Sequence, residues 1–334
     1  MARWWFAPGL WIFGACSAGS APPDPTPGSV AAPLAATASV RPEPDPATAA
    51  PPGPLAEEQV FLGSPDVPFL VTPRWSPAGD RLLVSGRYGV GLYLLDVPGG
   101  ALRTLDPSFQ GRAFWSPDNR RVVLPVPHAQ EAFEAIEIAS GVRERMPRPA
   151  FLPETIPLFE GLAGAEFLFD ADGRRVLYEE YRGRIVAWDG DRRVNLAEMD
   201  AWGPRVASDG RRVAWCEGHL HAAELVVAAL DGRVLFRGRG AHPAWLPDGV
   251  RLVYAEPAPA VGYDGRPFVG SADLWLLDVR DGGRVRLTDT PESIEMEPAI
   301  SPQGTRLAWA DWHDGSIHVA RLVAGPAAKE GGRP

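Results

Sequence analysis

The chain has 334 residues, a formal net charge of -9 at pH 7 and 45% hydrophobic residues, which occur in short runs. A chain of this length can bury a large core, and short apolar runs are typical of an all-β globular protein. The acidic balance and the lack of an arginine cluster argue against a nucleic-acid partner, because such proteins concentrate positive charge on one face.

The first residues have the pattern of a secretory signal. An apolar run follows Arg3 and ends in small residues before Cys16, and it is too short to span a bilayer. The stretch Phe13-Gly-Ala-Cys16 resembles the lipobox of bacterial lipoproteins. The resemblance implies a signal peptide over 1–15 and a lipid on Cys16, and Ser17 after it implies an outer-membrane address. Ordinary signal cleavage a few residues further on is the alternative.

Residues 16–56 contain eleven prolines and few aromatic residues. Such a segment cannot bury enough apolar area to offset the cost of ordering, so we expect a disordered Pro/Ala-rich stalk. We expect the lipid to be the only contact with the membrane and the folded head to lie in the periplasm. Residues 326–334 are predicted to be a disordered tail.

Between the stalk and the tail, one pattern is repeated six times. The copies align on a turn residue, called here the anchor: Gly79, Asn119, Gly173, Gly210, Gly249 and Gly304. An apolar residue stands four positions before each anchor, an arginine two positions after it, and apolar residues three and five positions after it. Alternation with period two predicts a strand with one buried face, so each copy contains a strand, a hairpin turn and a second strand.

The anchors are 40, 54, 37, 39 and 55 residues apart. These spacings suit four-stranded blades of a β-propeller. After the sixth anchor the chain lacks a fourth strand, but Glu58–Pro77 superposes without gaps on Gly283–Pro302. We therefore expect the N-terminal strand to complete the last blade, which would close a six-bladed ring over 57–325 and remove its open edges.

Two spacings are long because of insertions at 147–161 and at 256–271, which we expect to be long loops. The six repeated arginines are expected to pack their stems across their own hairpins and to keep their charge in solvent. Cys216 follows Trp215 on a predicted strand and is expected to be a small buried residue.

The repeated Trp-Ser-Pro-Asp-Gly-x-Arg turn, followed by a strand such as Leu274–Val279, resembles the repeats of TolB-like six-bladed β-propellers. The resemblance covers about 57–325 and implies an all-β propeller of four-stranded antiparallel blades. It also implies that one end of the central channel receives a segment of a partner or holds an ion.

The residue seven positions before each anchor should lie at the mouth of that channel. These six residues are Thr72, Arg112, Glu166, Gly203, His242 and Glu297. Four of them can carry charge, which is more polarity than a purely structural strand start requires. Glu295 lies two residues before Glu297 and should share its face. We expect these seven residues to contact a partner, whereas solvated strand ends are the alternative.

No catalytic constellation is found, and no Gly-x-Ser-x-Gly elbow occurs. We therefore expect a monomeric, non-enzymatic lipoprotein that binds an envelope protein or peptide at the channel mouth, without a cofactor. The alternative is a propeller enzyme or sugar binder that uses the channel carboxylates and His242, with a divalent metal bound by Glu166, His242, Glu295 and Glu297. A purely structural envelope protein is the third hypothesis.

Overall fold

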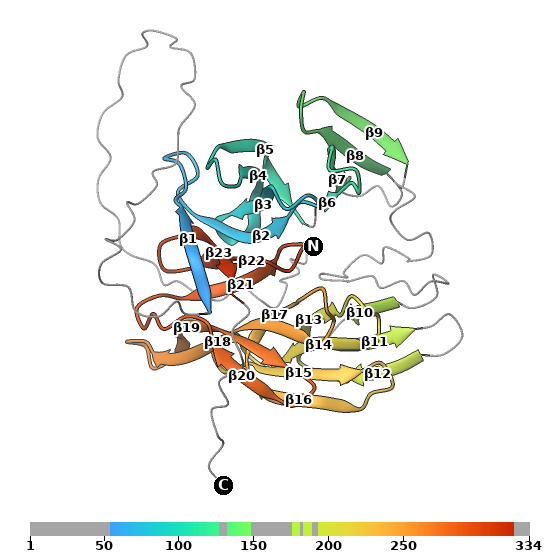
Figure 1. Ribbon diagram of the computed structural model, residues 1–334, viewed down its shortest axis with the longest axis vertical. Coiled ribbons are helices and arrows are strands. Elements are labelled where there is room, and N and C mark those ends of the chain that lie inside the picture. The colour runs from blue at the N-terminus through green and yellow to red at the C-terminus, as the bar shows by residue number, and fades with distance from the viewer. Residues whose placement is uncertain are drawn as a thin grey trace, which may run out of the picture.

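The computed structural model describes residues 54–111, 113–126, 132–147, 176–180, 183–188 and 193–323. The expected signal peptide with Cys16, the stalk up to residue 53, the tail, Arg112 and Glu166 lie outside these ranges. Within them, the chain forms antiparallel sheets and two short 3-10 turns, η2 (Arg87–Gly89) and η3 (Leu220–Ala222) (Figure 1). None of the helical segments in the described ranges has the length and apolarity needed to cross a membrane. The prediction of an all-β chain is confirmed.

The first three sheets follow one another along the chain. Sheet 1 holds β2 (Leu70–Trp75), β3 (Arg81–Gly86), β4 (Val90–Asp96) and β5 (Leu102–Gln110). Sheet 2 holds β6 (Phe114–Trp115), β7 (Arg121–Pro125), β8 (Ala132–Glu137) and β9 (Arg143–Pro147). Sheet 3 holds β10 (Val176–Glu180), β11 (Arg184–Trp188) and β12 (Arg193–Ala197) within the described residues.

The other three sheets have four strands each. Sheet 4 holds β13 (Ala201–Val206), β14 (Arg212–Glu217), β15 (Glu224–Ala229) and β16 (Val234–Arg239). Sheet 5 holds β17 (Ala241–Trp245), β18 (Arg251–Val261), β19 (Pro267–Asp278) and β20 (Gly283–Arg286). Sheet 6 holds β21 (Glu295–Ile300), β22 (Arg306–Asp311), β23 (Ser316–Leu322) and, as its outer strand, β1 (Leu55–Phe61).

The anchors form the hairpin turns that the repeat predicts. In sheet 5 the Gly249 N–H donates to the Leu246 carbonyl (3.0 Å), and φ at Gly249 is 68°. A side chain is disfavoured at this φ, which explains why glycine or asparagine occupies the anchor. The expectation that the strand after the turn buries one face only is wrong, because Leu252, Val253, Tyr254 and Ala255 are all fully buried. Leu252 and Tyr254 pack toward sheet 4, whereas Val253 and Ala255 pack toward sheet 6.

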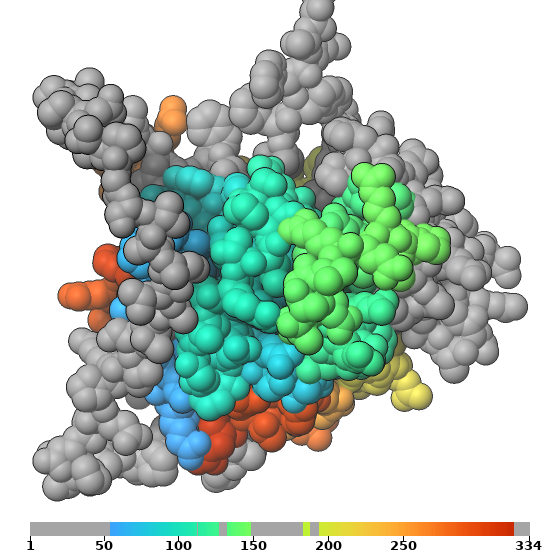
Figure 2. Space-filling view, turned by 90° about the horizontal axis from the view of Figure 1, so that it is seen from above, coloured from blue at the N-terminus to red at the C-terminus, as the bar shows by residue number. Residues whose placement is uncertain are grey.

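The N-terminal strand lies where the sequence places it. β1 pairs antiparallel with β23, with Val60 opposite His318 and Phe61 opposite Ile317 (Figure 2 shows the blue strand against the red ones). The gapless alignment of Glu58–Pro77 with Gly283–Pro302 is wrong by one residue at this point. It matches Leu62 with Leu287, which is buried. Leu62 is 46% exposed and Phe61 is 1% exposed. From Gln59 to Phe61 the pairing with β23 is regular, and it places Phe61 rather than Leu62 in the core.

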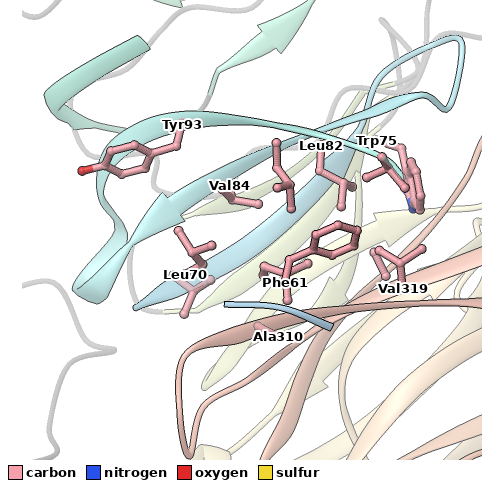
Figure 3. Packing of buried hydrophobic residues seen from close by; sticks show 13 residues of the cluster. Phe61, Leu70, Trp75, Leu82, Val84, Tyr93, Ala310 and Val319 are labelled. Carbon is pink, nitrogen blue, oxygen red and sulfur yellow. The ribbon is translucent and has the colours of Figure 1, made fainter. Parts of the chain in front are cut away.

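The core consists of apolar layers between consecutive sheets. Separate buried clusters join sheet 1 to sheet 2, sheet 3 to sheet 4, sheet 4 to sheet 5, and sheet 5 to sheet 6. A further cluster joins sheet 6 to sheet 1, and there Phe61 and Val319 pack against Leu70, Leu82 and Val84 (Figure 3). The last sheet is therefore a packing neighbour of the first.

The repeated tryptophan connects neighbouring sheets. This tryptophan stands four positions before the anchor of its own sheet. Its indole N–H donates to a backbone carbonyl of the neighbouring sheet, that of the residue five positions before that sheet's anchor. The bonds run from Trp75 to Ala299 (3.0 Å), from Trp115 to Arg74 (3.4 Å) and from Trp245 to Arg205 (2.9 Å). Sheet 1 therefore follows sheet 6 in the same way as sheet 2 follows sheet 1 and sheet 5 follows sheet 4.

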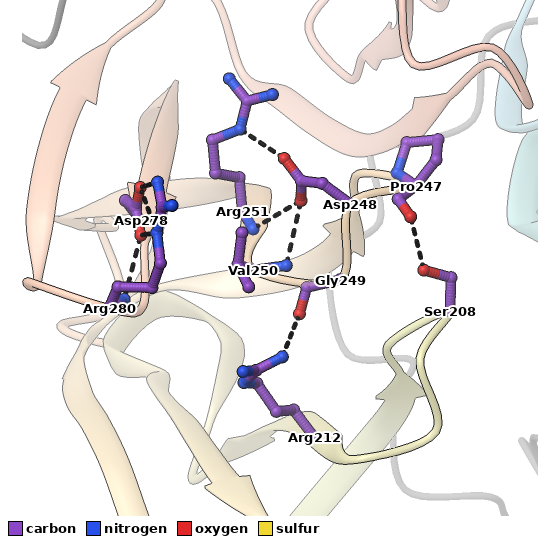
Figure 4. Close-up of polar contacts among 9 residues, drawn as sticks. All are labelled: Ser208, Arg212, Pro247, Asp248, Gly249, Val250, Arg251, Asp278 and Arg280. Atoms are coloured by element: carbon purple, nitrogen blue, oxygen red, sulfur yellow. Dashed lines mark hydrogen bonds and ion pairs between the residues drawn. The ribbon is translucent and has the colours of Figure 1, made fainter.

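The expectation for the repeated arginines is wrong for two of them. Arg212 donates to the Gly249 carbonyl of the next sheet (2.9 Å), beside a bond from Ser208 to the Pro247 carbonyl (Figure 4). Arg306 in the same way donates to the Gly79 carbonyl. Arg212 also pairs with Asp209 of its own turn (2.6 Å). The other three described copies pair with carboxylates of their own sheets: Arg81 with Asp96, Arg121 with Glu137, and Arg251 with Asp248.

The insertion at 256–271 is not a loop. β18 and β19 continue past the other strands of sheet 5 and remain paired from Glu256 opposite Asp273 as far as Val261 opposite Pro267. The turn at the tip exposes 98% of Tyr263. Most of the insertion at 147–161 lies outside the described residues. Cys216 is buried, as expected.

Candidate functional site

The position seven residues before the anchor has an unusual backbone. In all four described copies φ is positive: 56° at Thr72, 62° at Gly203, 51° at His242 and 54° at Glu297. Each residue starts a bulge in which it and the proline after it lie opposite one residue of the next strand. Proline suits a bulge because it has no N–H to give to the ladder. Positive φ is disfavoured for every residue except glycine, and doubly so before proline.

One of these residues links the last sheet to the first. The Glu297 carboxylate on β21 accepts a hydrogen bond from the backbone N–H of Thr72 on β2 (2.7 Å) and lies 3.4 Å from the Thr72 hydroxyl. Burial raises the pKa of Glu297, although the bond from Thr72, a hydrogen bond from Trp312 and the charge of Arg74 act in the opposite direction. The two bulges are thus joined directly.

His242 lies between two indoles at the start of β17. The ring centroids of Trp202 and Trp312 lie 5.4 and 5.8 Å from that of the imidazole, both edge-on. The Nε2 atom of His242 is buried without a hydrogen-bond partner, whereas the Trp312 indole interacts with the Glu297 carboxylate. Burial, with a smaller effect of Arg205, lowers the pKa of His242 to about 4. The imidazole is therefore neutral at pH 7, with a buried nitrogen available for a hydrogen bond.

Glu295 does not share the surroundings of Glu297. Its carboxylate accepts a hydrogen bond from the Thr288 hydroxyl, and the residue is only 3% exposed. Burial raises the pKa of Glu295 to about 7, against the effects of Thr288, Thr290 and the nearby His318. The bulge at Glu297 explains the difference, because a residue with positive φ redirects its side chain.

The structure therefore brings Thr72 together with Glu297. It also shows three neighbours of His242 that could not be predicted from the sequence: Trp202, Trp312 and Arg205. The prolines after four of the six positions were a signal of the bulges, since proline inside a strand marks a bulge or an edge. In the described part of the chain, no three His, Cys, Asp or Glu side chains gather closely enough to hold a metal ion.

This arrangement offers a buried polar atom to a hydrogen-bonding ligand. A buried unpaired polar atom costs about 1–3 kcal/mol, and strained torsions cost about as much each. Such costs are found mainly at functional sites. A ligand that hydrogen-bonds to Nε2 of His242 would recover part of this free energy.

Comparison with protein families gives no match for the sequence. One stretch of 64 residues, 19% of the chain, is 38% identical to Tricorn protease homolog 1 of Streptomyces coelicolor. That stretch covers only 6% of the Streptomyces protein.

Similar solved structures include TolB and other β-propeller proteins. TolB from Acinetobacter baumannii is 16% identical, with a TM-score of 0.41, over 77% of this chain and 64% of that one. The putative TolB from Agrobacterium tumefaciens is 16% identical, with a TM-score of 0.43, over 80% and 98%. The Cps50 (Swd1) β-propeller domain from Myceliophteria thermophila is 14% identical, with a TM-score of 0.42, over 76% and 84%.

Proposed function

We propose that this protein is a non-catalytic interaction module whose six sheets are the blades of one β-propeller ring. Its mouth, lined by the bulge residues, binds a segment of an envelope protein or a peptide. The contact between sheet 6 and sheet 1, with β1 as the outer strand of sheet 6, supports closure of the ring. The unpartnered Nε2 atom of His242 between two indoles is the observation that carries the binding proposal.

A protein segment suits this mouth for a chemical reason. Aromatic side chains and buried hydrogen-bonding groups at the centre of a concave site carry most of the free energy of typical protein interfaces. Trp202 and Trp312 provide the aromatic surface, and His242 and Glu297 provide the polar groups. We further propose that the protein is a monomer, anchored to the outer membrane through a lipid on Cys16, with the head in the periplasm. Only the N-terminal sequence supports the anchor.

The binding proposal is tested by capture from envelope extracts with the full chain, followed by titration of the purified captured protein. We expect His242→Ala to weaken binding of that protein at least about tenfold, because the substitution removes a central polar and aromatic contact. His221→Ala is the matched control, since His221 lies on the partly exposed turn η3, and it should leave the affinity unchanged. Equal affinities of both variants and the wild type, or turnover of a sugar substrate by the purified chain, would refute the proposal.

A further inference from the structure

The hairpin of β18 and β19 projects beyond the rest of sheet 5. These strands have 11 and 12 residues, whereas the other described strands have nine or fewer. β17 pairs with β18 only as far as Ala255, and β20 pairs with β19 only from Trp275 onward. The projecting part of the hairpin, residues 256–271, is called the arm below.

The arm begins beside the mouth. The first residue of β17 to pair with β18 is Ala241, which directly precedes His242. Near the base of the arm, Val269 is buried in a cluster against which Leu220 of η3 and Trp312 pack. Trp312 is one of the two indoles beside His242. The arm therefore extends from the edge of the proposed binding site.

The outer part of the arm exposes apolar side chains. Every residue from 258 to 268 is exposed or half-buried. At the tip, Val261 and Tyr263 are 73% and 98% exposed, and Phe268 is 37% exposed. The side chains of Arg266 and Asp264 lie 3.7 Å apart, so the two charges of the tip offset each other. The tip thus presents an uncharged apolar and aromatic surface.

The backbone of the arm is poorly suited to pairing with a further strand. Pro257, Pro259 and Pro267 have no N–H to donate, and proline at the edge of a sheet blocks the addition of another strand. Exposed tyrosine and apolar side chains, in contrast, are typical of protein interfaces. The arm is therefore built to contact a partner through side chains.

The length of the arm sets the size of that partner. The five steps from Glu256 to Val261 span about 17 Å at about 3.4 Å per residue. A short peptide held at His242 ends well before the tip. A protein interface of standard size buries about 800 Å² on each partner, which corresponds to a patch of about 16 Å radius. Such an interface, centred on the mouth, includes the arm.

We propose that the arm is a second contact site for the partner bound at the mouth, and that this partner is a folded protein with an apolar surface patch rather than a short peptide. This inference rests on the proposed function of the mouth. One segment of the partner bonds to His242, while the apolar patch packs on Val261 and Tyr263. Both contacts belong to one complex, so the loss of either weakens it.

The arm is tested by titration of the full chain with the purified envelope protein that the wild type captures. We expect the double variant Val261→Ser/Tyr263→Ser to bind this protein about tenfold more weakly, because it loses an aromatic contact at the interface. Val142→Ser is the matched control, since Val142 is 62% exposed in the turn before β9, and it should leave the affinity unchanged. The Tm of both variants should equal that of the wild type, because the substituted side chains are exposed.

The size of the partner is tested with the shortest peptide of the captured protein whose binding depends on His242. We expect the wild type and the double variant to bind this peptide equally, because it does not reach the tip. A loss of peptide binding in the double variant would show that the tip acts on the mouth itself, and would overturn the assignment of a second site.

The outcomes separate this inference from the proposal for the mouth. If His242→Ala weakens binding of the captured protein and the double variant does not, the arm inference fails and the mouth proposal stands. If His242→Ala binds as tightly as the wild type, the mouth proposal fails and the arm inference with it. A wild-type dimer in sedimentation that the double variant converts to a monomer would assign the tip to a second copy of this chain and would overturn the proposal.

Discussion

Three residues at the start of the bulges hold backbone torsions that only glycine adopts freely. Thr72, His242 and Glu297 have φ values between 51° and 56°, and a proline follows each of them. Such torsions cost about 1–3 kcal/mol each and persist only where the surrounding structure enforces them. The bond from Thr72 N to Glu297, and the indoles around His242, supply that enforcement.

Because the backbone at Thr72 is strained, we expect the glycine and alanine variants at this position to reverse their usual order of stability. Thr72→Gly keeps the backbone N–H that donates to Glu297 and relieves the torsion, whereas Thr72→Ala keeps the strain. We expect the glycine variant to be about 1 kcal/mol more stable than the alanine variant in urea unfolding. At Ser85, which lies on the facing strand β3, the usual order should hold, with alanine more stable by about 0.5–1 kcal/mol. Alanine being the better residue at both positions would show that Thr72 is unstrained.

At the scale of the elements, the repeated hairpins are joined through their turns. Arg306 donates to the Gly79 carbonyl of the neighbouring sheet, and its guanidinium lies 4.6 Å from the centroid of the Trp75 ring. Arg81 occupies the same repeat position but pairs with Asp96 of its own sheet at 3.2 Å. One residue type at one repeat position therefore has two structural roles, according to the turn that faces it.

This difference predicts unequal effects of one conservative substitution. Arg306→Lys removes a planar group that both stacks on an indole and donates to a carbonyl, so we expect a loss of about 1–2 kcal/mol in the free energy of unfolding. Arg81→Lys, the matched control, should cost less than about 0.5 kcal/mol, because an exposed ion pair contributes little. Thermal and urea unfolding of the two variants measure the comparison, and equal losses would contradict the role assigned to Arg306.

At the scale of the whole molecule, the two ends of the described chain meet in one sheet. β1 lies at the outer edge of sheet 6, and Phe61 enters the cluster that joins this sheet to sheet 1 (Figure 3). The apolar layer between the first and last sheets therefore includes a side chain from the first described strand. Loss of that side chain should affect the entire fold rather than one sheet.

We expect Phe61→Ala to lower the free energy of unfolding by about 3–5 kcal/mol, the typical cost of deleting a buried phenylalanine side chain. Leu62→Ala is the control, because Leu62 is 46% exposed and should change stability by less than about 0.5 kcal/mol. Chemical unfolding followed by tryptophan fluorescence measures both effects. A larger loss for Leu62→Ala would restore the register of the gapless superposition.

The local features of this fold were predictable from the sequence because their causes are local. Turn chemistry at Gly249 and its counterparts, with an apolar strand after each turn, specifies hairpins without reference to the rest of the chain. Counting from the anchors also located Thr72, Gly203, His242 and Glu297 at equivalent positions. The pairing of β1 with β23 followed from the incomplete last repeat, because an unpaired edge strand is unfavourable.

Tertiary structure alone decided the contacts between residues far apart in the chain. The bond between Thr72 and Glu297 joins residues 225 positions apart, and the indoles around His242 come from two other sheets. The bulges separated Glu295 from Glu297, and the prolines at 256–271, which suggested a loop, were accommodated in a paired hairpin. Period and turn chemistry depend on neighbours in sequence, whereas the direction of a bulged side chain and its partners depend on how separate sheets pack.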